Sequence, residues 1–188
     1  MRTLLSLAVL VFCAAIAHAA PARYILEPDA STVGFTWDFE GVEQQGRMPV
    51  SRADLTLDFS RPEASAIAVR LNVAEARAGF PFATQAMRGD RVLNAAAHPV
   101  SLFRRTRICG ITSEARVEGQ ITVRGVTRPI TLNAQIFRER GRPDGDLSRL
   151  VIQMTGSLNR HDFGAAGFRG LVGETVGLRI LARIQRAN

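Results

Sequence analysis

Hydrophobic and polar residues alternate with a period of two along most of this chain, which is the pattern of half-buried β-strands. Residues 33–39, for example, place a valine and three aromatic side chains at every second position, with glycine, threonine and aspartate between them. Similar segments, separated by turns that contain glycine or proline, occur at about 24–27, 53–59, 67–73, 100–109, 114–124, 130–138, 148–158 and 174–186. Eight or nine such strands predict one all-β domain, built as an antiparallel barrel or sandwich.

The clearest hairpin is predicted at residues 117–136, where two alternating segments flank a five-residue turn. Gly125 can adopt a positive φ in that turn. Pro129 is expected to open the returning strand, where a missing N–H costs least. The register of the strands also predicts which charged residues face solvent, because a slip by one residue would bury them in place of the apolar set. The charged residues expected to face solvent are Asp38, Asp54, Asp58 and Arg70.

One segment breaks the alternation. Residues 83–97 are rich in Ala, Met, Gln, Arg and Leu, which favour a helix, and Pro99 limits how far that helix can run. Gly89 weakens the pattern in its middle. We therefore expect a short helix at about 83–95, or two shorter ones, and no second domain.

The N-terminus has the pattern of a cleaved export signal. Arg2 is followed by an apolar stretch from Leu4 to Ile16 and by a small-x-small site, Ala17-His18-Ala19. The apolar stretch is shorter than the roughly 20 residues that a membrane-spanning helix needs. We predict a signal peptide at residues 1–19, a mature domain at 20–188 and export to the periplasm.

The chain carries a formal net charge of +7, and all 24 of its basic residues are arginine. The arginines are scattered, with local groups only around 104–107 and 138–142, and neither group has the interleaved aromatic residues that stack on bases. The pattern predicts a solvated outer face, with transient contact with an anionic membrane surface as the alternative. It does not favour nucleic acid as a partner.

Residues with catalytic potential are few and separate. The mature chain would contain His98, His161 and Cys109, without the spacing of a metal site. His161 is adjacent to Asp162, and neighbouring residues of an extended strand point to opposite faces. Phosphate-binding and nucleophile-elbow motifs are missing from the sequence. We predict no enzyme activity, no cofactor and no metal.

Several motifs, in order along the chain, resemble the YceI-like family. The most specific is Gly119-x-Ile121-Thr122-x-x-Gly125-Val126-Thr127-x-Pro129-Ile130. The others are Tyr24-x-Leu26-x-Pro28-Asp29, Met87-x5-Leu93 followed by His98-Pro99-x-x-x-Phe103, and Asn159-Arg160-x-Asp162-Phe163-Gly164. The resemblance implies a small periplasmic or secreted protein with a lipocalin-like antiparallel barrel of about eight strands and one short helix. Such a barrel would hold a long isoprenoid chain.

The candidate ligand-binding residues are the large apolar side chains expected to face inward, with Met87 and Leu93 forming a helical lid. They are Phe35, Trp37, Phe39, Leu57, Phe59, Val69, Leu71, Met87, Leu93, Phe103, Ile121, Leu132, Ile136, Met154 and Leu158. Composition alone favours a core that these side chains simply fill, as in many small barrels. The resemblance instead favours an exported, non-catalytic protein that binds a polyisoprenoid or a similar long-chain amphiphile. A structural or interaction protein with a filled core stays the alternative, and the sequence predicts no oligomeric state.

Overall fold

The computed structural model describes residues 21–110, 113–139 and 141–187, and the predicted signal peptide lies outside these ranges. Within them, eleven strands form one antiparallel sheet. The strands are β1 (Ala22–Leu26), β2 (Thr32–Phe39), β3 (Val42–Met48), β4 (Val50–Leu57), β5 (Ala66–Asn72), β6 (Arg77–Ala78), β7 (Val100–Gly110), β8 (Glu114–Val123), β9 (Val126–Arg138), β10 (Arg149–Asn159) and β11 (Val172–Arg186). The α-helix α1 (Pro81–Arg88) and three 3-10 turns, Pro28–Ala30, Pro62–Ala64 and Arg160–Phe163, complete the described secondary structure.

Eight of the strands close into a ring. The hydrogen-bonded order runs from β1 through β4, β5, β7, β8, β9 and β10 to β11, and β11 pairs again with β1. Closure removes the exposed sheet edges that an open sheet would present. The predicted all-β, lipocalin-like antiparallel barrel with one short helix is confirmed.

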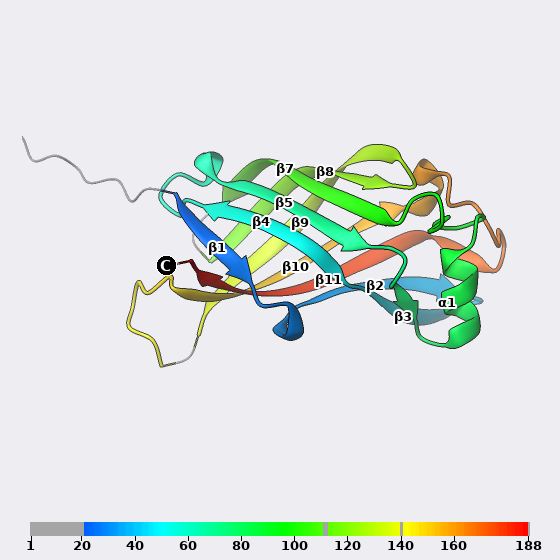
Figure 1. The fold of residues 1–188 in the computed structure, drawn as a ribbon, viewed down its shortest axis with the longest axis horizontal. Coiled ribbons are helices and arrows are strands. Elements are labelled where there is room, and N and C mark those ends of the chain that lie inside the picture. Colours follow the sequence, from blue (N-terminus) through cyan, green and yellow to red (C-terminus); the bar gives the residue numbers. More distant parts are fainter. Residues whose placement is uncertain (1–20, 111–112, 140, 188) are drawn as a thin grey trace, which may run out of the picture.

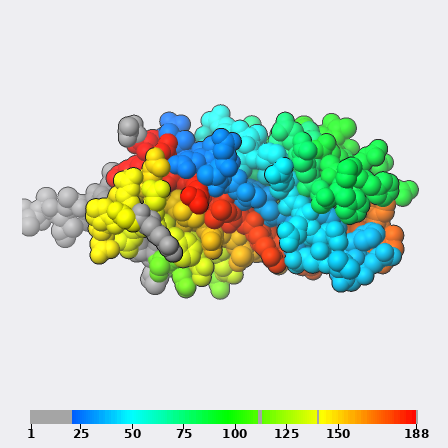
Figure 2. All heavy atoms as spheres, turned by 90° about the horizontal axis from the view of Figure 1, so that it is seen from below, coloured from blue at the N-terminus to red at the C-terminus, as the bar shows by residue number. Residues whose placement is uncertain are grey.

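The remaining strands lengthen the wall of this barrel at one end. The long strand β11 pairs with β2 along its first part and with β1 at its last residues. The strand β3 pairs with β2 and, after Pro49, the chain continues as β4 inside the ring. Figure 1 shows the resulting elongated molecule, with α1 beside β3 at one end and β1 near the C-terminus at the other. In Figure 2 the β2–β3 hairpin, the α1 region and residues of the 160s gather at the same end.

The helix is shorter than predicted and begins earlier. It starts at Pro81, which suits the first helical position because its missing N–H has no intrahelical role there. It ends at Arg88, since Gly89 adopts an extended conformation and residues 90–97 form successive turns. The prediction of a helix at about 83–95 was therefore wrong at both ends, because it gave too little weight to Gly89 and did not include Pro81 in the helix.

The hairpin between β8 and β9 is tighter than predicted. Val123 pairs directly with Val126, so the turn consists of Arg124 and Gly125, which both have positive φ. This is the favoured geometry of a two-residue hairpin. Pro129 lies within β9 opposite Gln120 and does not open the strand. The alternation of antiparallel pairs from the turn directs its nitrogen away from β8, and the pairing of β9 with β10 begins only at Asn133.

Asp58 also differs from the prediction, because its side chain is buried rather than facing solvent. The strand β4 ends at Leu57, one residue before it. The Asp58 carboxylate accepts hydrogen bonds from the backbone N–H groups of Ser60 and Arg61, at 3.0 and 2.8 Å. It therefore stabilises the turn after β4 and is not part of the alternating pattern.

Candidate ligand-binding site

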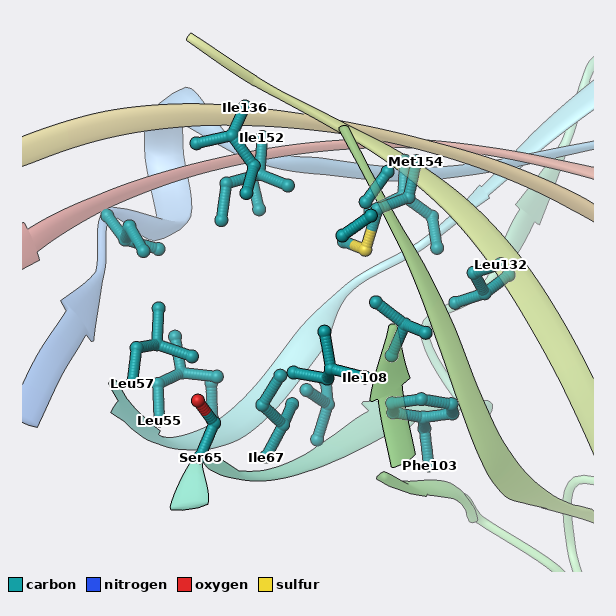
Figure 3. Close-up of a pocket in the computed structure, with 18 of the residues that line it drawn as sticks. Leu55, Leu57, Ser65, Ile67, Phe103, Ile108, Leu132, Ile136, Ile152 and Met154 are labelled. Atoms are coloured by element: carbon teal, nitrogen blue, oxygen red, sulfur yellow. The ribbon is translucent and has the colours of Figure 1, made fainter. Parts of the chain in front are cut away.

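A cavity of about 380 Å³ lies within the eight-stranded ring, and we call it the central cavity. Aliphatic side chains from β4, β5 and β7–β11 form most of its wall. Figure 3 shows leucine, isoleucine and methionine side chains from opposite sides of the barrel pointing into the same space. Its polar side chains are few, namely Ser31, Asp58, Ser60 and Ser65. Such a wall suits an apolar ligand without fixing its orientation.

Glycine makes room for one aromatic ring of this wall. The ring of Phe103 on β7 lies over Gly119 on β8, where an added Cβ would be 2.5 Å from the ring. Real Cβ atoms essentially never come that close, so the ring of Phe103 occupies space that a side chain at position 119 would need. The first residue of the family-like motif therefore has a packing role in the barrel.

A second cavity of about 400 Å³ lies beneath α1, and we call it the helix-end cavity. Its wall is more aromatic than that of the central cavity. The strand β2 contributes Phe35 and Trp37, whose rings stack with centroids 5.6 Å apart. Met87 of α1 and Leu93 of the following turns line the cavity as well. The two cavities share four wall residues, Val33, Leu71, Ile121 and Leu178, and they therefore adjoin.

Every residue of the predicted binding set lines one of these cavities. Those that line the central cavity are Leu57, Phe59, Val69, Phe103, Leu132, Ile136 and Met154. Those that line the helix-end cavity are Phe35, Trp37, Phe39, Met87, Leu93 and Leu158. Leu71 and Ile121 line both cavities. The structure thus brings the set together in two groups. Ligand contact by these residues stays a prediction.

Sequence reasoning missed part of the helix-end wall. Phe80, Phe82, Phe163 and Phe168 line it, and they lie at the start of α1, in a 3-10 turn or in a loop, where no alternation marks an inward position. Val33 and Leu178 belong to alternating strand faces, and following those faces to their ends would have found them. Ser101 and Arg160 were missed because polar residues are not expected on an apolar wall.

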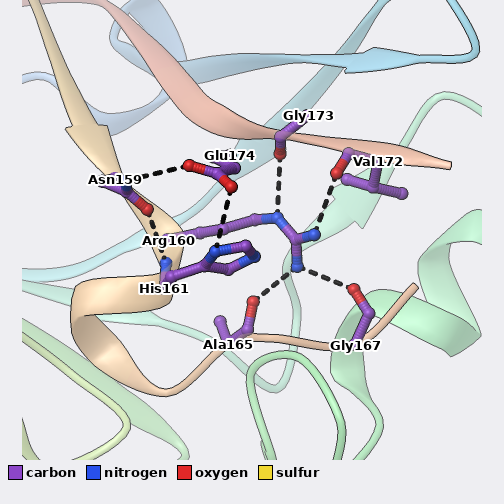
Figure 4. A network of polar contacts seen from close by, with 8 residues as sticks. All are labelled: Asn159, Arg160, His161, Ala165, Gly167, Val172, Gly173 and Glu174. Carbon is purple, nitrogen blue, oxygen red and sulfur yellow. Dashed lines mark hydrogen bonds and ion pairs between the residues drawn. The ribbon is translucent and has the colours of Figure 1, made fainter. Parts of the chain in front are cut away.

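Arg160 is buried to an unusual degree for an arginine, with 5% of its surface exposed. As Figure 4 shows, its guanidinium donates to four backbone carbonyls. Nε donates to Gly173 at 2.8 Å, Nη1 to Ala165 and Gly167 at 2.5 and 2.8 Å, and Nη2 to Val172 at 2.9 Å. Burial lowers the pKa of Arg160 from its ordinary value, against the opposing effect of the nearby Glu174 charge. The side chain holds residues 164–171, which we call the closing loop, against the start of β11.

Other arginine side chains fasten the same end of the molecule. Arg124 of the hairpin turn donates through Nη1 to the carbonyls of Asp90 and Val92, at 2.6 and 2.7 Å. Arg88 of α1 donates to the carbonyl of Ala76 at 2.8 Å. We call α1, the turns after it and the closing loop the cover of the helix-end cavity. These bonds hold the cover in place through backbone carbonyls rather than through carboxylates.

The groups with catalytic potential lie on separate elements, with His98 just before β7, Cys109 in β7 and His161 in the 3-10 turn after β10. Nδ1 of His161 lies 3.6 Å from a carboxylate oxygen of Glu174, and the neighbouring Asp162 is not its partner. Cys109 is a free thiol on β7. Within the described ranges, no three His, Cys, Asp or Glu residues are grouped as metal ligands. No helix of the described residues is long and apolar enough to cross a membrane.

Exposed aromatic residues surround the helix-end cavity on its outer side. Phe82 is 73% exposed, and Phe80 and Phe168 are 43% and 37% exposed, although all three also line the cavity. Arg169, which is exposed, follows Phe168 in the closing loop. Large apolar side chains that lie partly in a cavity and partly in solvent are typical of a ligand entrance.

Comparison with known proteins identifies the relatives of this barrel. The model of the YceI-like domain matches residues 24–184. The chain belongs to the YceI-like family. A UPF0312 protein of Pectobacterium carotovorum is 24% identical over 177 residues, covering 86% of this chain and 85% of that protein. The protein YceI of Escherichia coli O157:H7 is 26% identical over 137 residues, covering 70% of this chain and 65% of that protein.

Solved structures show the same fold at low sequence identity. The crystal structure of BcnA from Burkholderia cenocepacia aligns with a TM-score of 0.74 and 14% identity, covering 85% of this chain and 99% of BcnA. A YceI protein of Campylobacter jejuni aligns with a TM-score of 0.61 and 18% identity, covering 76% of this chain and 84% of that protein. The family and the fold together support a binding protein.

Proposed function

We propose that this YceI-like protein is an exported, non-catalytic carrier of a polyisoprenoid or a similar long-chain amphiphile. The observation that carries the proposal is the pair of adjoining apolar cavities along the long axis of the barrel. An extended hydrocarbon chain fits such a lumen because each buried methylene contributes about 0.8 kcal/mol without directional contacts. Export is supported by the signal-like pattern of residues 1–19.

The entrance of the ligand is proposed at the helix end. Phe80, Phe82 and Phe168 can insert into the outer part of a bilayer, while Arg169 is placed to contact anionic headgroups. A chain leaving the bilayer there would enter the helix-end cavity without crossing water.

Recovery of ligand with the protein tests the proposal. The protein is purified from a bacterial periplasm without detergent and examined by native mass spectrometry. We expect a bound apolar molecule of several hundred daltons. Repeated recovery of ligand-free protein that also fails to bind an added prenyl quinone would favour the alternative, a structural protein without a ligand.

Trp37 provides a second readout, because it is the single tryptophan of the chain and lines the helix-end cavity. A prenyl quinone that enters this cavity should quench its fluorescence. Trp37→Phe, which is expected to lose the signal while still binding the quinone by mass spectrometry, is the control. Saturating binding without any change in fluorescence would remove Trp37 from the site.

A further inference from the structure

Ser101 stands at an inward position of the barrel where the pattern calls for an apolar residue. It lies at the start of β7, pairs with Leu71 of β5 and is 2% exposed. Two residues further along the same strand, Phe103 lines the central cavity. Ser101 itself lines the helix-end cavity, together with Leu71 and Val123.

The hydroxyl of Ser101 has no hydrogen-bond partner among the described residues. Buried hydroxyl groups in folded proteins nearly always have one, because leaving the group unpaired loses the hydrogen bonds that water would supply. The buried polar groups of the central cavity obey this rule. Ser65 Oγ accepts a hydrogen bond from the N–H of Asp58 at 3.0 Å, and the Asp58 carboxylate is held by the turn that follows.

Arg160 adds positive charge to the same wall. The guanidinium has five N–H groups, and four of them donate to backbone carbonyls. Among the described residues, no carboxylate oxygen lies within 4 Å of it, since Arg160 forms none of the ion pairs found there. The carbonyl dipoles offset part of the charge, and the remaining potential favours an electron-rich group in this cavity.

We propose that the helix-end cavity holds the oxygen-bearing head of the ligand, with Ser101 Oγ donating a hydrogen bond to it, while the apolar tail extends into the central cavity. The head is an uncharged carbonyl or hydroxyl. One free hydroxyl and an arginine that is already engaged are too few donors for a buried phosphate. This assignment rests on the proposed carrier function and adds to it the chemistry of the head and the direction of the chain.

The test compares two probes with the same tail, a naphthoquinone with a four-unit prenyl chain and the prenyl hydrocarbon of that length. Their affinities are measured by equilibrium partition from detergent micelles. Ser101→Ala should weaken quinone binding about five-fold and change hydrocarbon binding by less than about two-fold, since one neutral hydrogen bond is lost. Ser101→Thr keeps the hydroxyl and should retain the preference for the quinone.

Ser65→Ala is the matched control, because Ser65 is as buried as Ser101 but lies in the central cavity with its partner in place. It should leave the ratio of the two affinities unchanged. An unchanged ratio in Ser101→Ala, or tighter binding of geranylgeranyl phosphate than of the quinone, would overturn the assignment. If Ser101→Ala does not fold, Ser101→Cys, a near-isostere with a much weaker donor, decides the same question. Failure of the wild-type protein to bind either probe would instead refute the carrier function, and the assignment with it.

Discussion

The two cavities of this barrel are similar in size but differ in how their walls are held. The wall of the central cavity is built mainly from side chains that alternate along strands of the closed ring, and residues of the turn after β4 complete it. The helix-end cavity is covered by α1, the turns after it and the closing loop. Hydrogen bonds from arginine side chains to backbone carbonyls fasten this cover.

The difference has a thermodynamic consequence. Opening the strand wall of the central cavity requires the cooperative loss of long strand ladders, whereas α1, the turns after it and the closing loop can loosen by losing a few side-chain bonds. Entry and release of a ligand are therefore expected at the helix end, and the central cavity is expected to stay closed throughout. Four changes test this contrast, and they are given from the largest expected effect to the smallest.

Arg160→Met should have the largest effect. It removes four hydrogen bonds and leaves their carbonyls unpaired in a buried region, so we expect the free energy of unfolding to fall by about 3 kcal/mol. Hydrogen exchange should accelerate in the closing loop more than in β8 and β9. Arg169→Met, an exposed position of the same loop, is the control. Equal loss of protection in the ring would contradict the idea that the two ends open independently.

Leu71→Trp should separate the two cavities. Leu71 lies on both walls, so a larger side chain there blocks the passage between them. We expect an eight-unit prenyl chain to lose about ten-fold in affinity, equivalent to about 1.4 kcal/mol, while a two-unit chain binds as before. Ile25→Trp adds the same bulk at an exposed position outside both cavities and serves as the control. Equal weakening of both chains would show that the cavities do not act as one lumen.

Phe82→Ser should slow ligand uptake from vesicles. Phe82 is the most exposed aromatic residue at the helix end, and losing its contact with the bilayer should reduce the uptake rate about five-fold. The assay measures transfer of a prenyl quinone from vesicles that contain phosphatidylglycerol. Phe137→Ser changes an aromatic residue on β9 that is 45% exposed and lines neither cavity, and it should leave the rate unchanged. A larger effect of Phe137→Ser would place the entrance elsewhere.

Lowering the pH should reduce the free energy of unfolding through Asp58, which holds the turn after β4. This is the smallest of the four effects. Burial raises the pKa of Asp58, but hydrogen bonds from Arg61 and Ser60 and the charge of Arg61 outweigh it and hold the pKa below the ordinary value of 3.8. Because the folded state then binds the proton less readily than the unfolded state, this stabilisation is complete above about pH 4 and is lost as the pH falls through the folded pKa. Thermal unfolding between pH 5 and pH 2 should show the decline.

Asp58→Asn should flatten that decline, since the amide does not titrate. Asp54→Asn provides the comparison, because the exposed ion pair of Asp54 with Arg52 contributes little to stability. An identical pH dependence in the wild type and in Asp58→Asn would mean that other carboxylates control acid unfolding.

The sequence predicts the ring of strands better than the cover of the helix-end cavity, because only the strands have a regular pattern of apolar and polar residues. Strand alternation repeats every two residues, so the inward positions of Leu57, Leu132 and Met154 follow from local pattern alone. The cover has no such period. Gly89 ends α1 early, and the side chain of Arg160 reaches a set of carbonyls that only the folded loop brings together. Asp58 illustrates the same limit, since it lies one residue beyond the end of a regular strand.

The large sequence separations between β11 and its partners bear on how the barrel forms. This strand pairs with β1, β2 and β10, and through Arg183 it contacts Ser31, which is 152 positions earlier in the chain. Residues of β11 line both cavities, so neither wall is complete until this strand has docked. Contacts between such distant segments form slowly, because the loop between them must first be ordered. Until β11 docks, the apolar faces of its neighbouring strands stay exposed, and this is the stage of folding at which the protein is most prone to aggregate.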